Sequence, residues 1–175
     1  MKLIKFFFIL LICCGCICSS GCQRNNNSLL EHQDSGDEDI MVGMPNPFVQ
    51  VSDIDRARKV SGINAELLKA VPAGFRNTPQ ISVLGRNHMV QMIYFDNVDP
   101  TKKLNYRVSD KLSPSVMNGD FNKYPVQKNI VINGIEIKVK GDDTGFRTVE
   151  WSNRGLNYCI LSDIPLTETD IQWML

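Results

Sequence analysis

A chain of 175 residues has room for one domain and additional segments, and its 43% hydrophobic and 22% charged residues are typical of a globular protein. Lysine and arginine together number 19, as do aspartate and glutamate, so the formal net charge at pH 7 is zero. A balanced chain creates no field that would draw it as a whole onto a polyanion, so the composition argues against nucleic acid as a partner.

Residues 1–21 have the pattern of a secretory signal peptide. Lys2 and Lys5 form a short basic region, and an apolar stretch that begins at Phe6 follows them. The uncharged stretch from Phe6 to Gly21 is shorter than the roughly 20 residues that a membrane-spanning helix needs. We therefore expect a cleaved segment and not a permanent membrane span.

The segment SSGC, which ends at Cys22, resembles the site where lipoprotein signal peptidase cleaves and a diacylglyceryl group is attached to the thiol. Small residues precede Cys22, and the polar run QRNNNS follows it. Cys22 is therefore the predicted first residue of the mature chain and the predicted lipidation site. The segment departs from the usual bacterial pattern because Ser19 stands where leucine is commonest, and cleavage before Cys16 is the alternative.

Cleavage before Cys22 decides the role of the other cysteines. Four of them would leave with the signal peptide: Cys13, Cys14, Cys16 and Cys18. Only Cys159 would stay in the mature chain as a thiol, and we expect it to be a small buried residue on a strand. No disulfide framework is predicted, although an extracytoplasmic compartment would permit one.

Residues 22–43 are predicted to form a lipid-anchored, acidic, flexible tether. Their polar sequence offers too little apolar surface to offset the entropy lost on ordering. As a flexible coil the tether would hold the domain on the order of 20 to 25 Å from the membrane. The acidic residues between 34 and 39 lack the spacing and the closing glutamate of an EF-hand, which favours a solvated spacer over a calcium site.

Residues 44–175 are predicted to form one extracytoplasmic domain that opens with a short helix over 53–61. Ser52 or Asp53 would cap the start of this helix, and Gly62 would end it. Ile54, Ala57 and Val60 would form its apolar stripe. Residues 65–75 are compatible with a longer helix or with a strand that leads into a turn at residues 73–74.

Beyond Pro79 the apolar residues alternate with a period of two, which predicts β-strands. Two strands flank a turn at residues 85–87, and residues 104, 106 and 108 share one face of a further strand. The clearest signal is Asn133-Gly134, a two-residue hairpin turn that would pair Ile132 with Ile135 and Ile130 with Ile137. Those four residues and Val139 would share one face, and the opposite face would carry Glu136, Lys138 and Lys140.

Residues 146–161 repeat the hairpin pattern, with Gly155 suited to the left-handed position of a three-residue loop. Thr167 is placed to cap a closing helix over 167–174, whose apolar side is Ile171, Met174 and Leu175. The predicted fold class is therefore α+β: a single antiparallel β-sheet, built as a meander of hairpins and packed by short N- and C-terminal helices.

Five segments of residues 46–175 resemble, in the same order, an uncharacterised extracytoplasmic family called domain of unknown function 4367: NPFVQVSDIDRARKVSGI, VPAGF, MVQMIYFD, NGIEIKVKG and VEWSNRGLNYCILSDIPLTETDI. The most specific part is matched by Trp151, Gly155, Tyr158, Leu166 and Thr167. The resemblance implies a C-terminal module of bacterial lipoproteins and anti-sigma-factor-like membrane proteins. The family's last helix usually runs on beyond the position of Leu175, and the resemblance carries over no catalytic or binding residue.

Side chains typical of enzyme active sites are few. His32 falls in the tether, so His88 is the only histidine of the predicted domain. A single histidine does not suffice for a two-histidine metal site and offers only one base for a histidine-dependent nucleophile. We therefore predict no catalytic residue, no metal site and no cofactor. Adjacent Asp142 and Asp143 are more typical of a turn than of a catalytic pair. An enzyme would need carboxylates that converge in space, drawn from Asp120, Asp142, Asp143 and Glu150.

Trp151 and Tyr158 are the candidate binding residues, because two aromatic side chains on a hairpin can line a platform for a sugar or a peptide; the alternative is core packing. The predicted function is that of a non-enzymatic lipoprotein on the outer face of the cell membrane, held there by its lipid anchor. It would bind an unknown extracytoplasmic protein or small ligand, possible roles being envelope sensing or regulation.

Two alternatives to this function are open. A lipid or lipoprotein carrier would use an apolar groove lined by Met89, Met92, Ile93 and Phe95. A hydrolase would need His88 within hydrogen-bond reach of a serine, cysteine or carboxylate in a cleft.

We expect that Cys22→Ala leaves the precursor uncleaved and without lipid, because the substitution removes the thiol that accepts the lipid. Intact-mass analysis of the membrane fraction measures this. Cys16→Ala is the control and should be processed normally. A mature N-terminus at Cys16 would contradict the assignment and would lengthen the tether.

Overall fold

A computed structural model describes residues 46–85 and 88–175 of the chain. The predicted signal peptide, the lipidation site Cys22, the tether, His32 and the predicted domain start at residue 44 lie outside the described residues. No helix in the described ranges combines the length and the hydrophobicity that a membrane span requires.

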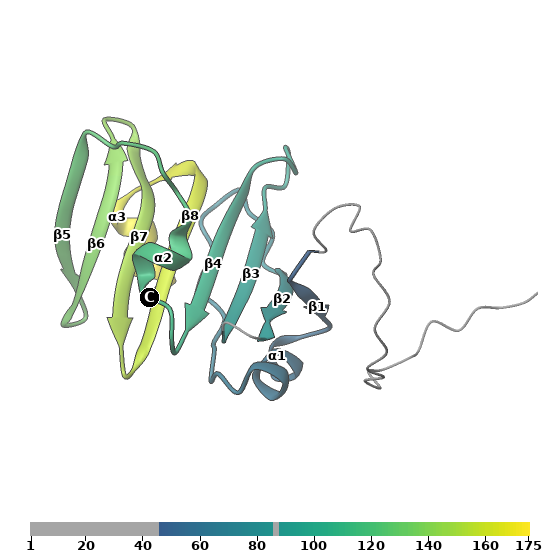
Figure 1. The fold of residues 1–175 in the computed structure, drawn as a ribbon. Helices are drawn as coiled ribbons and strands as arrows, with labels where there is room; N and C mark the ends of the chain where they lie inside the picture. Colours follow the sequence, from purple (N-terminus) through teal and green to yellow (C-terminus); the bar gives the residue numbers. More distant parts are fainter. Residues whose placement is uncertain (1–45, 86–87) are drawn as a thin grey trace, which may run out of the picture. The chain divides into compact units, whose positions relative to one another are not determined.

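Eight strands and three helices make up the described part of the chain. The strands are β1 (Val49–Val51), β2 (Gln80–Leu84), β3 (Met89–Phe95), β4 (Lys103–Ser109), β5 (Val126–Ile132), β6 (Ile135–Asp142), β7 (Gly145–Asn153) and β8 (Leu156–Leu166). The helices are α1 (Ile54–Ser61), α2 (Pro114–Asn118) and α3 (Glu168–Met174). All strands belong to one antiparallel sheet, so the predicted α+β class with a single sheet is confirmed (Figure 1).

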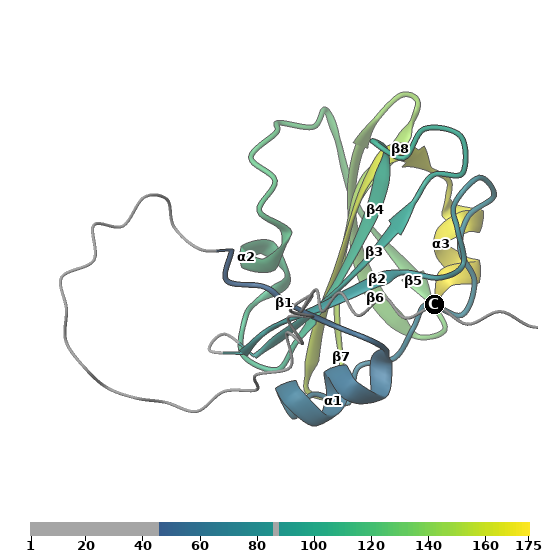
Figure 2. The ribbon, with the colours of Figure 1, turned by 90° about the vertical axis from the view of Figure 1, so that its right-hand side faces the viewer.

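Two meanders form this sheet, with the strand order β1-β2-β3-β4-β8-β7-β6-β5. The first meander adds β1 to β4 in chain order from one edge towards the middle. The chain then crosses to the far edge, and β5 to β8 return to the middle, where β8 pairs with β4. The sequence did not predict this crossover, residues 110–125, which carries α2. Figure 2 shows α2 and α3 on opposite sides of the sheet.

Helix α1 has the predicted ends. The Asp53 carboxylate accepts a hydrogen bond from the Arg56 N–H at 2.8 Å, and Gly62 ends the helix with a φ of 74°. The predicted apolar stripe is wrong at Val60, which is 47% exposed. Ser61 is buried beside Ala57 instead, and this is possible because its hydroxyl donates to the Ala57 carbonyl at 2.7 Å.

Helix α3 also begins and packs as predicted. The Thr167 hydroxyl accepts from the Asp170 N–H at 3.1 Å, and the Asp170 carboxylate accepts from the Thr167 N–H at 2.8 Å, which completes a capping box. Ile171 and Met174 are buried. Residues 65–75, compatible in sequence with a helix or a strand, form neither and follow an irregular path with a turn at residues 73–74.

The β5–β6 hairpin has the predicted register, with Ile132 opposite Ile135 and Ile130 opposite Ile137. The prediction of a three-residue loop for the β7–β8 hairpin is wrong. Asn153 pairs with Leu156, so Arg154 and Gly155 form a two-residue turn with φ values of 50° and 77°. Arg154 adopts the left-handed conformation because a turn of this hand matches the right-handed twist of the strands.

The two faces of the sheet differ in chemistry. The apolar face carries the main core, covered by α1, residues 63–75 and α3, with Ile137, Val139 and Leu104 fully buried. The opposite, polar face carries a smaller apolar cluster of Met89, Met117 and Cys159 and a set of buried polar residues. Those polar residues are Ser82, Gln91, Asn105, Asn118, Thr148 and Glu150.

A hydrogen-bonded network on the polar face ties the crossover to the sheet. The Arg107 guanidinium donates to the Gln91 side chain at 2.8 Å and to the backbone carbonyls of Met117 and Asn118. The Asn118 amide and the Lys140 ammonium both donate to one oxygen of Glu150, each at 2.8 Å. Because these groups are largely buried, the loss of one partner would leave another unsatisfied.

The register of the β5–β6 hairpin makes a stability prediction. Ile137→Ala should lower the free energy of unfolding by about 2 to 5 kcal/mol, because it leaves a cavity in the core. Lys138→Ala, one residue further on the opposite and exposed side, should have little effect. Urea titrations of both variants measure the difference, and equal losses would contradict the register.

Candidate functional site

Three aromatic side chains lie together on the apolar face. Tyr106 on β4, Tyr158 on β8 and Trp151 on β7 come from three adjacent strands. The rings of Trp151 and Tyr158, which are cross-strand partners, have centroids 5.0 Å apart and planes at 5°. The Tyr106 ring lies 6.2 Å from Trp151 and 6.4 Å from Tyr158. These similar distances describe a compact triangle of nearly parallel rings and not a linear column.

The aromatic triangle is buried unevenly. Tyr106 and Trp151 are 4% and 6% exposed, whereas Tyr158 is half-buried. Burial raises the pKa of both tyrosine hydroxyls, and the carboxylate of Glu66 adds to the effect. Both hydroxyls therefore stay protonated near neutral pH, and the hydroxyl of the half-buried Tyr158 can donate a hydrogen bond to a ligand.

A pocket of about 600 Å³ opens over this triangle, and we call it the aromatic pocket. Its walls come from residues 66–69, from the β5–β6 and β7–β8 turns and from the end of α3. Apolar side chains of Leu67, Leu68, Ile132 and Ile135 are joined at the rim by three charged residues: Glu66, Lys69 and Arg154. This size and this mixture of apolar and polar groups are typical of small-molecule sites.

Two backbone hydrogen bonds hold the outer wall of the aromatic pocket. The Leu68 N–H donates to the buried Tyr94 hydroxyl at 3.4 Å. The Lys69 N–H donates to the Met174 carbonyl in the last turn of α3 at 3.1 Å. The irregular segment of residues 65–75 is therefore fixed to both the sheet and α3, although it has no regular secondary structure of its own.

The two candidate binding residues are thus brought together in one pocket. Trp151 and Tyr158 both line the aromatic pocket, and Trp151 also belongs to the core. The sequence missed Tyr106, which it placed on a strand face without linking it to the other two rings. It also missed Glu66 and residues 67–69, because an irregular segment has no periodic signal.

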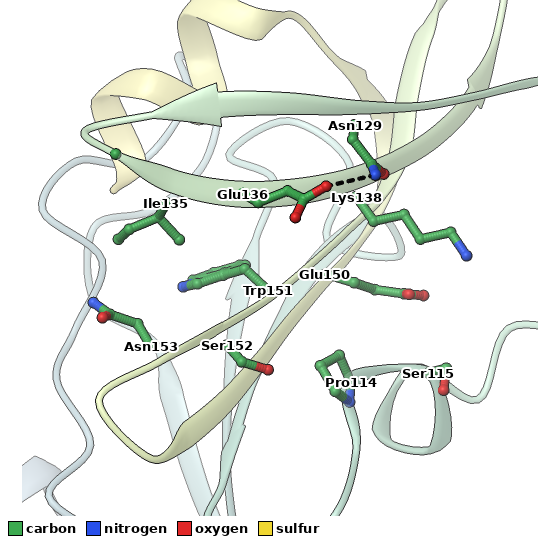
Figure 3. A pocket seen from close by; sticks show the side chains of 11 residues that line it. Pro114, Ser115, Asn129, Ile135, Glu136, Lys138, Glu150, Trp151, Ser152 and Asn153 are labelled. Atoms are coloured by element: carbon green, nitrogen blue, oxygen red, sulfur yellow. Dashed lines mark hydrogen bonds between the residues drawn. The ribbon is translucent and has the colours of Figure 1, made fainter.

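A second cleft of about 630 Å³ lies on the polar face, and we call it the polar cleft. Figure 3 shows Pro114 and Ser115 of α2 on one side of it, and Glu136 and Asn129 of the β5–β6 hairpin on the other. The Asn129 amide donates to the Glu136 carboxylate at 2.8 Å. Lys138, Glu150 and Ser152 complete the polar lining.

The groove predicted for the carrier alternative does not form from the residues named for it. Met92 is fully buried in the main core on the apolar face. Met89 is buried on the opposite face, against Met117 and Cys159. Ile93 and Phe95 alternate with Met92 along β3 and are half-buried on the side of Met89. The four residues therefore do not share one surface.

The imidazole ring of His88 contacts two charged side chains, and one of them occupies a ring nitrogen that a catalytic base would need. Its Nδ1 atom lies 3.5 Å from the Asp110 carboxylate, and its Nε2 atom lies 2.8 Å from the Lys111 ammonium. Because an ammonium group can only donate, Nε2 is the acceptor of that bond and is occupied. The Ser109 hydroxyl donates to the His88 backbone carbonyl at 2.7 Å and not to the ring. His88 lines neither the aromatic pocket nor the polar cleft.

The four candidate carboxylates have different surroundings. Asp142 accepts from Thr144 in the β6–β7 turn, which lowers its pKa, and Asp143 is exposed in the same turn. Glu150 lies roughly 16 Å further along β7, at a rise of about 3.3 Å per residue. Asp120 accepts from the Tyr124 hydroxyl at 2.6 Å within the crossover. Within residues 46–85 and 88–175, no three histidine, cysteine or acidic side chains are grouped to hold a metal ion.

Cys159 is buried on β8, as predicted, with 1% of its surface exposed. Burial raises the pKa of its thiol to about 12, so the reactive thiolate is scarce at neutral pH. Cys159 is therefore a packing residue beneath α2.

No protein-family model, no curated protein and no solved structure matches this chain, so the resemblance to domain of unknown function 4367 stays a prediction.

Proposed function

We propose that this protein is a lipoprotein of the outer face of the cell membrane whose domain binds a ligand in the aromatic pocket and catalyses no reaction. The observation that carries the proposal is the half-exposed Tyr158 beside two buried rings, at the base of a pocket of about 600 Å³. An aromatic base with a charged rim offers apolar contact area and a few hydrogen bonds that orient a ligand.

The rigidity of the pocket supports a binding role. Its three rings stand on β4, β8 and β7 in the interior of the sheet, and each packs against the other two. Side chains that are already fixed before a ligand arrives lose little conformational entropy on binding. The base of the pocket is therefore largely formed before a ligand binds.

Two observations disfavour an enzyme. The imidazole Nε2 atom of His88 is occupied by Lys111. Three of the carboxylates that could replace a histidine, Asp120, Asp142 and Glu150, already accept hydrogen bonds from neighbouring groups. General acid-base catalysis needs at least one such group within reach of a bound substrate. His88 lines neither the aromatic pocket nor the polar cleft.

The predicted lipid anchor would place this binding activity at the cell membrane. A domain held by Cys22 and a short flexible tether would meet ligands and membrane proteins close to the outer face of the cell membrane. Ligand binding in this position suits envelope sensing or regulation. The bound partner would then be an extracytoplasmic protein or a small ligand.

A photo-crosslinking experiment on the full chain in its own membranes tests the proposal. A benzophenone amino acid at Leu67, which lines the aromatic pocket and is 43% exposed, should give a specific adduct. The same probe at Val98, which is 91% exposed and lines neither cleft, should not. Tyr158→Ala should reduce the Leu67 adduct several-fold, because it removes part of the aromatic base.

His88→Ala is the matched negative control and should leave the yield of the Leu67 adduct unchanged. Equal adducts at positions 67 and 98, or an adduct that is insensitive to Tyr158→Ala, would contradict binding in the pocket. A broad hydrolase screen should be negative. Turnover that disappears in His88→Ala would replace the binding proposal with the hydrolase alternative.

A further inference from the structure

The tips of the two hairpins in the second meander are not paired with each other. The ladder between β6 and β7 ends at the pair Ile137 and Trp151. The β5–β6 ladder continues to Ile135, and the β7–β8 ladder continues to Asn153. The two tips therefore part beyond Trp151 and leave a notch in the sheet, which we call the hairpin notch.

The hairpin notch lies where the aromatic pocket and the polar cleft come closest to each other. Four residues line both cavities, although these open on opposite faces of the sheet: Gly134, Ile135, Trp151 and Asn153. Figure 3, drawn at the polar cleft, shows the Trp151 indole between the β6 and β7 backbones, with Ile135 and Asn153 on either side. A ligand chain that occupied both cavities would therefore cross the sheet beside Trp151.

We infer that the ligand of the proposed binding site is an uncharged glycan chain that runs from the aromatic pocket through the hairpin notch into the polar cleft. This inference rests on the proposed function and specifies the chemical class of its ligand. Each cavity, at about 600 and 630 Å³, has the size of a whole small-molecule site. Together they suit an oligomer of several sugar units.

The charges along this path favour a neutral ligand. The side chains that line the two cavities include three cations, Lys69, Lys138 and Arg154. They also include three anions, Glu66, Glu136 and Glu150. A path with equal numbers of both signs gives no net attraction to a polyanion or a polycation. It instead offers donors and acceptors side by side, as the Asn129 and Glu136 pair does, and neighbouring sugar hydroxyls need both.

The aromatic rings match the other property of a sugar. A pyranose ring has apolar C–H faces and polar edges, so it can pack on an aromatic side chain while its hydroxyls reach polar neighbours. The half-buried Tyr158 supplies the accessible aromatic surface, with the buried Trp151 behind it, and Asn153 and Arg154 lie at the adjoining turn. The aromatic surface and the polar groups beside it therefore match the apolar face and the polar edge of one sugar ring.

A peptide chain fits the path less well. Extended peptides commonly bind to a sheet by adding a strand to a free edge. The free edges of this sheet are β1 and β5, whereas the hairpin notch lies between the interior strands β6 and β7. A peptide strand in the notch would have to insert between two hairpins, whose strands β6 and β7 pair directly with each other over most of their length.

Calorimetric titration of the purified full chain in detergent micelles tests this inference. The probes are N-acetylglucosamine and its β-1,4-linked dimer and hexamer, which share one repeating unit and differ in length. The affinity should rise by about tenfold or more from dimer to hexamer, because only the hexamer reaches the polar cleft. Tyr158→Ala should weaken the binding of both oligomers.

Glu136→Gln separates the polar cleft from the aromatic pocket. It removes a charged acceptor from the polar cleft and should weaken the hexamer about fivefold while the dimer is unaffected. Asp143→Asn makes the same change of charge at the other end of β6, outside both cavities, and should change neither affinity. Urea titration of each variant verifies that its folding is unchanged.

The outcomes separate this inference from the proposed function. Binding that does not depend on oligomer length, or that ignores Glu136→Gln, overturns the path through the notch. The absence of saccharide binding, with the Leu67 adduct intact, overturns the glycan and leaves the binding module standing. A peptide identified in the Leu67 adduct would also overturn the glycan and leave the proposed binding function in place. Loss of the Leu67 adduct itself overturns the proposed function.

Discussion

The pairing of β4 with β8 is the interaction on which the rest of the structure depends, because it joins the two meanders into one sheet. It places Tyr106 of the first meander beside Tyr158 and Trp151 of the second, so the aromatic pocket has a complete base only when this pairing forms. The strands are far apart in sequence, so a long loop must close before this contact is made. The site and the sheet therefore depend on the same non-local event.

The polar face reinforces this junction from the other side. Arg107 follows Tyr106 on β4, and its guanidinium binds carbonyls at the end of α2 while Tyr106 packs in the aromatic triangle. The crossover is bound again through Asn118 and Glu150. A buried polar network of this kind is sensitive to geometry, so it favours one position of α2 over the sheet. One strand thus fixes the aromatic pocket on one face and a wall of the polar cleft on the other.

The sequence predicted the elements whose signals are local. The cap at Asp53, the turn at Asn133-Gly134 and the capping box at Thr167 each lie within a few residues, and all three are present. Strand β1 and helix α2 were missed because three and five residues are too few for a periodic pattern. Trp151 and Tyr158 were found because one hairpin joins them, whereas Tyr106 and the hairpin notch arise from pairing between distant strands, which no local pattern encodes.

The position of β1 would have a mechanical consequence if the domain were held by the predicted N-terminal tether. Tension along the chain enters the described part of the protein at residue 46 and reaches β1, an edge strand of three residues. A short edge strand can be peeled from β2 one hydrogen bond at a time, at low force. Trp151 stands on β7, five strand positions away, or roughly 24 Å at about 4.8 Å per strand. Under such tension the β1 edge would therefore detach first, and the aromatic pocket would keep its shape.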